Sequence, residues 1–192
     1  MILVGMCCGG TVEAQTMLSL LNLLDGQTPF SIQIGGYKPH SMNNLVKEAK
    51  SLKATHLLSI DPDMIFPSDG LARLVAAKKD IVGVNYRARG NHVTQDAPAS
   101  TIKFPGNEEN GYRTVNEEDF PTELFECAAV GLGLTLIDMK VFDKLPFPWF
   151  HTTETTEHST EDIVFCKEAR EAGFEVWCDP TIEMGHIGKY VY

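Results

Sequence analysis

The stretch His56-Leu57-Leu58-Ser59-Ile60-Asp61-Pro62-Asp63 joins a short apolar run to two aspartates separated by one proline. An apolar run of this length predicts a buried β-strand, and the strand ends directly at Asp61. Two carboxylates at a strand end form a hard oxygen site that suits Mg²⁺ or Mn²⁺. Aspartate and proline are also common turn residues, so this stretch alone allows either a metal site or a solvated turn.

Strand and helix patterns alternate around this stretch through the first half of the chain. Apolar runs predict strands over residues 2–7, 30–34, 55–60 and 81–85. Helical spacing predicts helices over residues 11–24, 41–52 and 68–79, with N-caps at Thr11, Ser41 and Ser68. The alternation predicts an α/β fold with a mostly parallel central sheet flanked by helices. Ligands of such sheets bind at the carboxyl ends of strands, where Cys8-Gly9-Gly10 and Asp61-Pro62-Asp63 lie.

The second half carries three further motifs, and each also has a purely structural explanation. Gly131-Leu132-Gly133 lies between expected strands at 127–130 and 134–137, where a bulge or a close packing contact would also need glycine. Thr160-Glu161-Asp162 opens a predicted helix that ends near residue 172, and a threonine followed by acids is ordinary for a helix start. Gly185-His186-Ile187-Gly188 follows short strands expected at 175–178 and 181–184, and a single histidine is more often structural than a ligand.

The remaining segments are less regular. Residues 86–123 are richer in glycine, proline, asparagine and charge, and they predict short strands at 100–104 and 112–115 around a hairpin turn at 107–111. The polar stretch 151–159 has no periodicity and predicts a loop.

Composition narrows the class of protein. The chain has 192 residues, of which 43% are hydrophobic, and it carries a formal net charge of −10. Lysine and arginine dominate the affinity of proteins for nucleic acid, so this charge disfavours a nucleic-acid partner. No run approaches the roughly 18 apolar residues of a membrane span, and five cysteines without paired spacing fit a reduced, cytoplasmic protein.

In their order along the chain these motifs resemble the A-type (Rossmann-like) glycosyltransferases, and more narrowly the family-2-like branch seen in bacteria and phages. The resemblance rests on the strand-end aspartates, the Gly131-Leu132-Gly133 stretch, Pro148-Trp149-Phe150, the acidic helix start and the late His186. It implies a nucleotide-diphospho-sugar transferase (GT-A) fold in a single domain, residues 1–192. It also implies a donor-binding half at about 1–90 and an acceptor and catalytic half at about 120–192.

The resemblance further implies metal-dependent transfer of a sugar from a nucleotide-sugar donor to an acceptor hydroxyl. Asp63 and His186 would bind Mn²⁺ or Mg²⁺, and Asp61 would contact the donor ribose or the metal through water. Asp162, in preference to Glu161, would be the catalytic base. The other expected contacts are Cys7, Cys8 and Asn44 on the donor side and Gly131, Gly133, Trp149 and Phe150 on the acceptor side.

Several alternatives stay open at this level. Direct displacement would invert the anomeric configuration, whereas several relatives with a late metal-binding histidine retain it. The acceptor would be a glycan, a lipid-linked molecule or a modified base. A nucleotidyltransferase would usually carry a basic glycine-rich loop after its first strand, but Cys8-Gly9-Gly10-Thr11 has no lysine or arginine. A non-catalytic module that binds a nucleotide or a sugar on the same fold is the remaining alternative.

Overall fold

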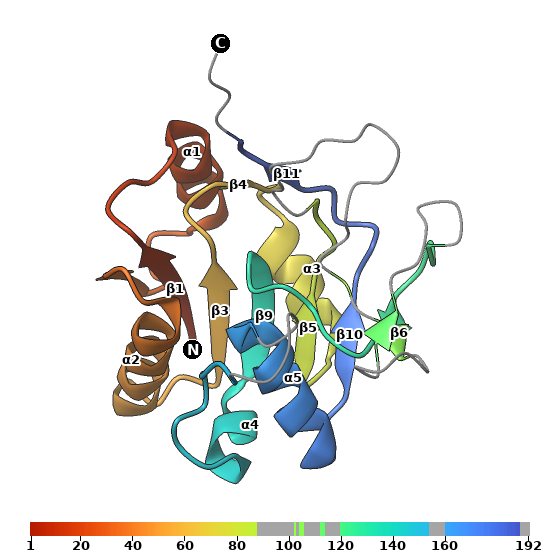
Figure 1. Cartoon of the computed structure of the whole chain (residues 1–192). Helices are drawn as coiled ribbons and strands as arrows, with labels where there is room; N and C mark the ends of the chain where they lie inside the picture. The colour runs from red at the N-terminus through yellow and green to blue at the C-terminus, as the bar shows by residue number, and fades with distance from the viewer. Residues whose placement is uncertain (88–101, 103, 106–111, 114–119, 154–159, 189–192) are drawn as a thin grey trace.

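The computed structural model describes residues 1–87, 102, 104–105, 112–113, 120–153 and 160–188 (Figure 1). Its centre is a seven-stranded sheet with the strand order β2-β1-β3-β9-β5-β10-β8. These strands are β2 (Phe30–Ile34), β1 (Ile2–Cys8), β3 (His56–Ile60), β9 (Leu134–Asp138), β5 (Ile81–Gly83), β10 (Val176–Cys178) and β8 (Phe125–Glu126). Five of them run in one direction, and β9 and β8 run in the opposite one. The mixed α/β fold with a mostly parallel sheet is therefore confirmed.

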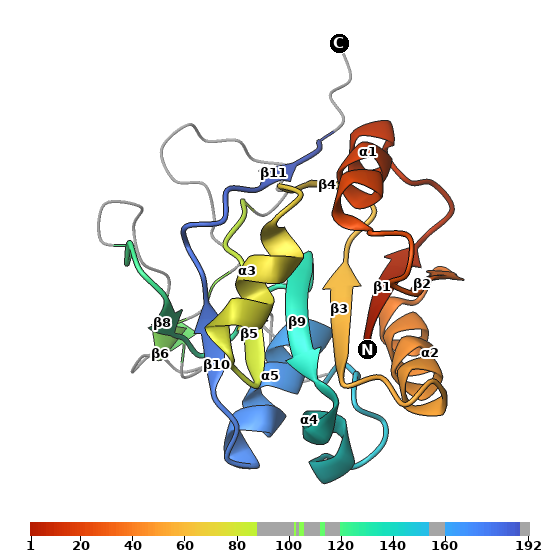
Figure 2. The same cartoon turned by 180° about the vertical axis from the view of Figure 1, so that it is seen from behind.

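Helices cover both faces of this sheet (Figures 1 and 2). One face carries α2 (Lys38–Ser51), α4 (Met139–Lys144) and α5 (Glu161–Glu171), and the other carries α1 (Ala14–Leu23) and α3 (Gly70–Ala77). Successive strand residues point to opposite faces, so Leu57 packs in the first layer and Leu58 in the second. Both leucines are fully buried, which explains why β3 is largely apolar on both of its faces.

Two short strand pairs lie outside the main sheet. β4 (Met64–Ile65) pairs in antiparallel register with β11 (Gly185–His186), so that His186 lies opposite Met64. The Ile187 N–H extends this ladder by donating to the Asp63 carbonyl at 2.9 Å. β6 (Phe104–Pro105) pairs with β7 (Tyr112–Arg113), which confirms a hairpin here, although its predicted turn at 107–111 lies outside the described residues.

Several predicted boundaries are wrong. The predicted N-caps of the first three helices were Thr11, Ser41 and Ser68. The residues at the N-cap positions are instead Glu13, Tyr37 and Asp69. For α2 the reason is Pro39, whose fixed backbone angle suits the first helical turn and starts the helix earlier. For α1 the reason is tertiary, because the Glu13 N–H donates to the Pro62 carbonyl at 2.9 Å. Only Thr160 precedes its helix, α5, as predicted.

Two expected strands are also absent from their predicted positions. Residues 127–130 are buried but contain a single bridge residue, Ala129, and residues 181–184 contain no strand. The strand near the C-terminus is instead Gly185–His186, because it pairs with the segment that follows Asp63. Within the described ranges, no helix is both long and apolar enough to cross a membrane.

Candidate functional site

The carboxyl ends of β1, β2 and β3 meet the start of α5, and charged side chains gather there. Lys38 follows β2, Asp61 follows β3, and Glu161 is the first residue of α5. The Lys38 Nζ lies 2.7 Å from Asp61 Oδ1 and 3.0 Å from Asp61 Oδ2, so the ammonium contacts both carboxylate oxygens. The same Nζ lies 3.7 Å from Glu161 Oε1. Asp61 and Glu161, which are 100 positions apart in the sequence, thus share the Lys38 ammonium across the sheet edge.

Burial and charge shift the ionisation of this group. Burial by itself lowers the pKa of Lys38, but the charge and hydrogen bond of Asp61 outweigh it and raise that pKa above its usual range. Burial raises the pKa of Glu161, Lys38 opposes the shift, and Asp162 adds to it. Burial also raises the pKa of Cys7 to about 12. At neutral pH the site therefore contains a firmly charged ammonium beside a protonated thiol.

Asp63 and His186 form a second group beside the first. His186 Nε2 lies 3.5 Å from Asp63 Oδ1, and both side chains are largely buried. His186 Nδ1 lies 2.6 Å from the Arg87 carbonyl oxygen. Because a carbonyl only accepts hydrogen bonds, Nδ1 carries the proton, and in the neutral ring Nε2 presents a lone pair to the Asp63 carboxylate. Two electron-rich groups face each other at this distance only when a cation or a proton lies between them.

This pair fits a divalent ion as a partial site. Among the residues that the structure describes, no group of three or more histidine, cysteine, aspartate or glutamate side chains could hold a metal ion. Asp63 and His186 supply one oxygen and one nitrogen donor, and the second ring nitrogen of His186 is fixed by a backbone carbonyl, as metal-ligating histidines require. A Mn²⁺ or Mg²⁺ ion here would need further oxygens from water or a bound phosphate.

Tyr86 connects the two groups. Its ring meets the His186 ring edge-on, with centroids 5.5 Å apart. Its hydroxyl accepts a hydrogen bond from the Gly133 N–H at 3.0 Å, and the Gly133 carbonyl accepts one from the Asp61 N–H at 3.2 Å. A Cβ at Gly133 would lie 2.5 Å from Met64 Cε and 2.7 Å from Tyr86 Cζ. Close packing against the backbone, one of the two explanations offered for Gly131-Leu132-Gly133, is therefore what requires glycine at position 133.

The start of α5 presents both predicted acids. Glu161 faces Lys38, as described above. Asp162 Oδ1 accepts hydrogen bonds from the Thr160 hydroxyl and from the Ile163 N–H, the latter at 2.9 Å. The Asp162 carboxylate thus stabilises the first turn of the helix in the manner of a capping residue.

Comparisons with known proteins find the same fold in solved structures. No protein-family model matches the chain, and neither does any curated protein. Among solved structures, A197 from STIV superposes with a TM-score of 0.66 at 14% identity, over 98% of this chain and 86% of that one. GalNAc-T7, solved with UDP, GalNAc and Mn²⁺, superposes with a TM-score of 0.57 at 12% identity, over 98% of this chain and 44% of that one.

The chain shares a glycosyltransferase-like fold with GalNAc-T7. At these identities the likeness establishes the fold and leaves the family open. The chain spans less than half of the GalNAc-T7 chain, so the activity of that whole protein does not transfer with the fold.

The other predicted site residues lie in different surroundings. Cys8 is buried, and its Sγ donates to the Thr11 carbonyl at 3.1 Å. Asn44 is half-buried on α2. The Gly131 carbonyl accepts a hydrogen bond from the Thr135 hydroxyl at 2.7 Å. Trp149 and Phe150 are 8% and 1% exposed and pack in the core against Phe142. A contact between either ring and an acceptor would require this part of the core to open.

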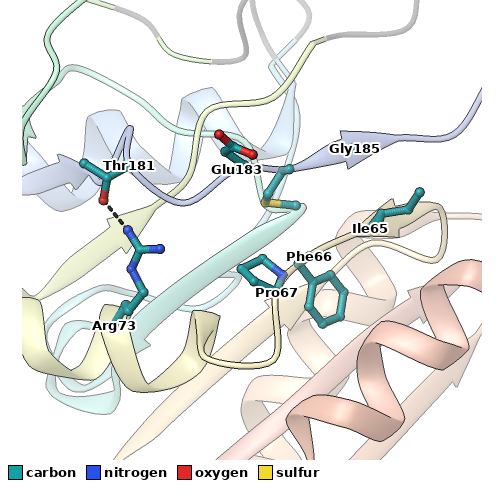
Figure 3. Close-up of a pocket in the computed structure, with 8 residues that line it drawn as sticks. Ile65, Phe66, Pro67, Arg73, Thr181, Glu183 and Gly185 are labelled. Carbon is teal, nitrogen blue, oxygen red and sulfur yellow. Dashed lines mark hydrogen bonds between the residues drawn. The ribbon is translucent and has the colours of Figure 1, made fainter.

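A separate pocket lies next to the β4–β11 pair (Figure 3). Its volume is about 610 Å³, and its lining combines apolar side chains with Arg73, Thr181 and Glu183. Arg73 donates to the Thr181 hydroxyl, which ties α3 to the segment before β11. Ile65 lines this pocket, whereas its neighbour Met64 is fully buried, as expected from the alternation of side chains along a strand.

Sequence reasoning missed Lys38 and the connecting role of Tyr86. The signal for Lys38 was available, because Gly35-Gly36-Tyr37-Lys38 follows a predicted strand just as Cys8-Gly9-Gly10 and Asp61-Pro62-Asp63 do. The same strand-end rule that selected the aspartates therefore selects this lysine.

The buried thiols make a prediction about reactivity. All five cysteines are buried, and burial raises the pKa of Cys7 and Cys166 to about 12. Because the thiolate is the reactive form, we expect the native protein to react with Ellman's reagent at pH 8 at least about tenfold more slowly than the denatured protein. Counting released thionitrobenzoate in buffer and in guanidinium chloride measures this, and five fast thiols in the native protein would contradict it.

Proposed function

We propose that this protein is a metal-dependent glycosyltransferase that moves a sugar from a nucleotide-sugar donor to an acceptor hydroxyl. The observation that carries the proposal is the Asp63–His186 pair at 3.5 Å, beside Lys38, Asp61 and Glu161, at the carboxyl end of a glycosyltransferase-like sheet. GalNAc-T7, which shares this fold, was solved with UDP, GalNAc and Mn²⁺, and this supports a nucleotide-sugar donor and a divalent cofactor here.

Asp63 and His186 would hold the cofactor, and Asp61 would face the donor. When bound, a divalent ion would neutralise the charge that develops on the leaving nucleoside diphosphate. The chain has a net charge of −10, so its own residues provide little general attraction for a diphosphate. In this proposal residues 1–90 contribute Lys38, Asp61 and Asp63 to the donor side. Residues 120–192 contribute His186 and the two acids at the start of α5, Glu161 and Asp162.

Asp162 would act as the general base. As the acceptor oxygen forms its bond to the anomeric carbon, the bond from that carbon to the diphosphate oxygen breaks, and the hydroxyl proton passes to the Asp162 carboxylate. Direct displacement of this kind inverts the anomeric configuration. The Glu161 carboxylate is engaged by the Lys38 ammonium, which makes Glu161 the weaker candidate for this step.

The metal role is tested by calorimetric titration of UDP with and without Mn²⁺. We expect binding of UDP to depend on Mn²⁺, and we expect Asp63→Ala to weaken the Mn²⁺-dependent binding by about tenfold or more, because it removes the charged oxygen donor of the pair. Asp69→Ala, which removes an exposed aspartate before α3, is the matched control and should bind as the unchanged protein does. Equal affinity with and without Mn²⁺ in the unchanged protein contradicts the metal role.

A binding module without catalysis is the second candidate, and the hydrogen bonds at Asp162 favour it. Thr160 and Ile163 already engage Asp162 Oδ1, which gives this carboxylate a structural function. Incubation with nucleotide sugars and Mn²⁺ separates the two candidates, because a binding module shows affinity without release of nucleoside diphosphate.

A further inference from the structure

We propose that Lys38 is a positioning residue that reserves Asp61 for the donor and confines the divalent ion to Asp63 and His186. This inference rests on the proposed function. It divides the two aspartates of Asp61-Pro62-Asp63 between two cations, an internal ammonium and an external metal ion.

The contact geometry supports this division. Lys38 Nζ lies within hydrogen-bond distance of both oxygens of Asp61, at 2.7 and 3.0 Å. An ammonium and a divalent ion need the same lone pairs, so an ion that approached Asp61 would have to displace Lys38 first. Asp63 instead faces the Nε2 atom of His186. His186 lies on β11, which pairs with β4 directly after the Asp61-Pro62-Asp63 turn.

The backbone holds both members of the Lys38–Asp61 pair in place. Lys38 is the first residue of α2, where Pro39 in the first turn restricts the backbone. The Asp61 N–H donates to the Gly133 carbonyl at 3.2 Å, which anchors the turn to β9. Neither partner can therefore leave the other by a simple movement of its backbone.

Lys38 also occupies a position where the helix dipole disfavours a positive charge. The first turn of a helix carries partial positive charge, so a lysine there is unfavourable unless carboxylates offset it. Asp61 and Glu161 provide that compensation from two other elements, and no acidic residue of α2 itself lies in its first turn. Local violations compensated by distant residues are typical of functional sites.

Lys38 also remains within reach of a ligand. Its side chain is 33% exposed, against 16% for Asp61, so the ammonium lies at the open side of the pair. A donor phosphate can contact Nζ there while Asp61 stays oriented. Lys38 thus holds the Asp61 carboxylate in place to contact the donor, and Asp61 is not a metal ligand.

The test is titration with Mn²⁺ alone, followed by the electron paramagnetic resonance signal of free Mn²⁺. We expect Lys38→Met to bind Mn²⁺ about tenfold or more tightly than the unchanged protein, because it frees the carboxylates of Asp61 and Glu161. This gain should disappear in the Lys38→Met, Asp61→Asn double variant. Lys38→Arg should show no gain, and neither should Lys47→Met, which removes one lysine charge from an exposed position on the same helix.

Unchanged Mn²⁺ affinity in folded Lys38→Met overturns the proposal. If Lys38→Met fails to fold, Asp61→Asn in the presence of Lys38 decides the question. We expect that variant to keep the Mn²⁺ affinity of the unchanged protein, and a loss of tenfold or more would show that Asp61 is itself a ligand. None of these measurements uses a nucleotide, so they are distinguishable from failure of the proposed transfer reaction.

Discussion

Replacing Asp162 with asparagine is expected to lower turnover by at least about 10²-fold, the lower end of what general-base catalysis contributes. Asparagine keeps a carbonyl oxygen that can accept the hydrogen bonds from Thr160 and Ile163, so the start of α5 should keep its structure. The substitution removes the negative charge of the carboxylate and with it the ability to accept a proton. Release of nucleoside diphosphate from a nucleotide sugar measures the rate, and UDP titration with Mn²⁺ checks that donor binding is unchanged.

Two companion variants separate catalysis from helix capping. Glu161→Gln should cost less turnover than Asp162→Asn, because the Glu161 carboxylate is already paired with Lys38. Asp162→Ala should lower stability by about 1 kcal/mol as well as the rate, since it also loses the capping hydrogen bonds. If Asp162→Asn keeps the full rate, Asp162 is a capping residue and the binding-module function gains support.

Replacing Asn43 with alanine is expected to lower the free energy of unfolding by about 3 kcal/mol. The Asn43 Nδ2 donates to the carbonyls of Pro39 and Phe150, at 2.8 and 2.7 Å. Its Oδ1 accepts from the N–H groups of Trp149 and Phe150, at 3.0 and 3.2 Å. Alanine leaves these buried backbone groups without partners. For a domain of this size the loss corresponds to a melting temperature lower by roughly 6–12 °C, measurable by differential scanning calorimetry.

The neighbouring Asn44 is the matched control for this prediction. It is half-buried on α2, and the resemblance assigns it to the donor side. Asn44→Ala should therefore leave the melting temperature within about 1 °C, as most surface substitutions do, and any effect should fall on UDP binding. Equal loss of stability in both variants would show that the hydrogen bonds of Asn43 are not the reason for its effect.

The alternation of apolar runs and helical spacing was enough to predict the fold class. β3, α5 and the hairpin of β6 and β7 were found at or near their expected places, because buried strands and helix faces impose periods that are visible in a single chain. Helix starts were predicted less well. Capping preferences are worth about 1 kcal/mol, and a tertiary contact such as Glu13 N–H to Pro62 outweighs them.

The sequence by itself determined which residues stand at strand ends, and so which side chains could gather at one edge of the sheet. Asp61 and Asp63 were identified on that basis, whereas the acids of α5 stood at a predicted helix start and the roles of these acids and of His186 came from the family resemblance. Only the tertiary structure decided how they are paired. β4 and β11 are two residues each and have no periodicity to detect, yet their pairing is what brings His186 to 3.5 Å from Asp63. Lys38 meets Asp61 because two separate crossovers end at the same sheet edge. Distances across that edge depend on the order of the strands in the sheet, and the local sequence pattern does not encode this order.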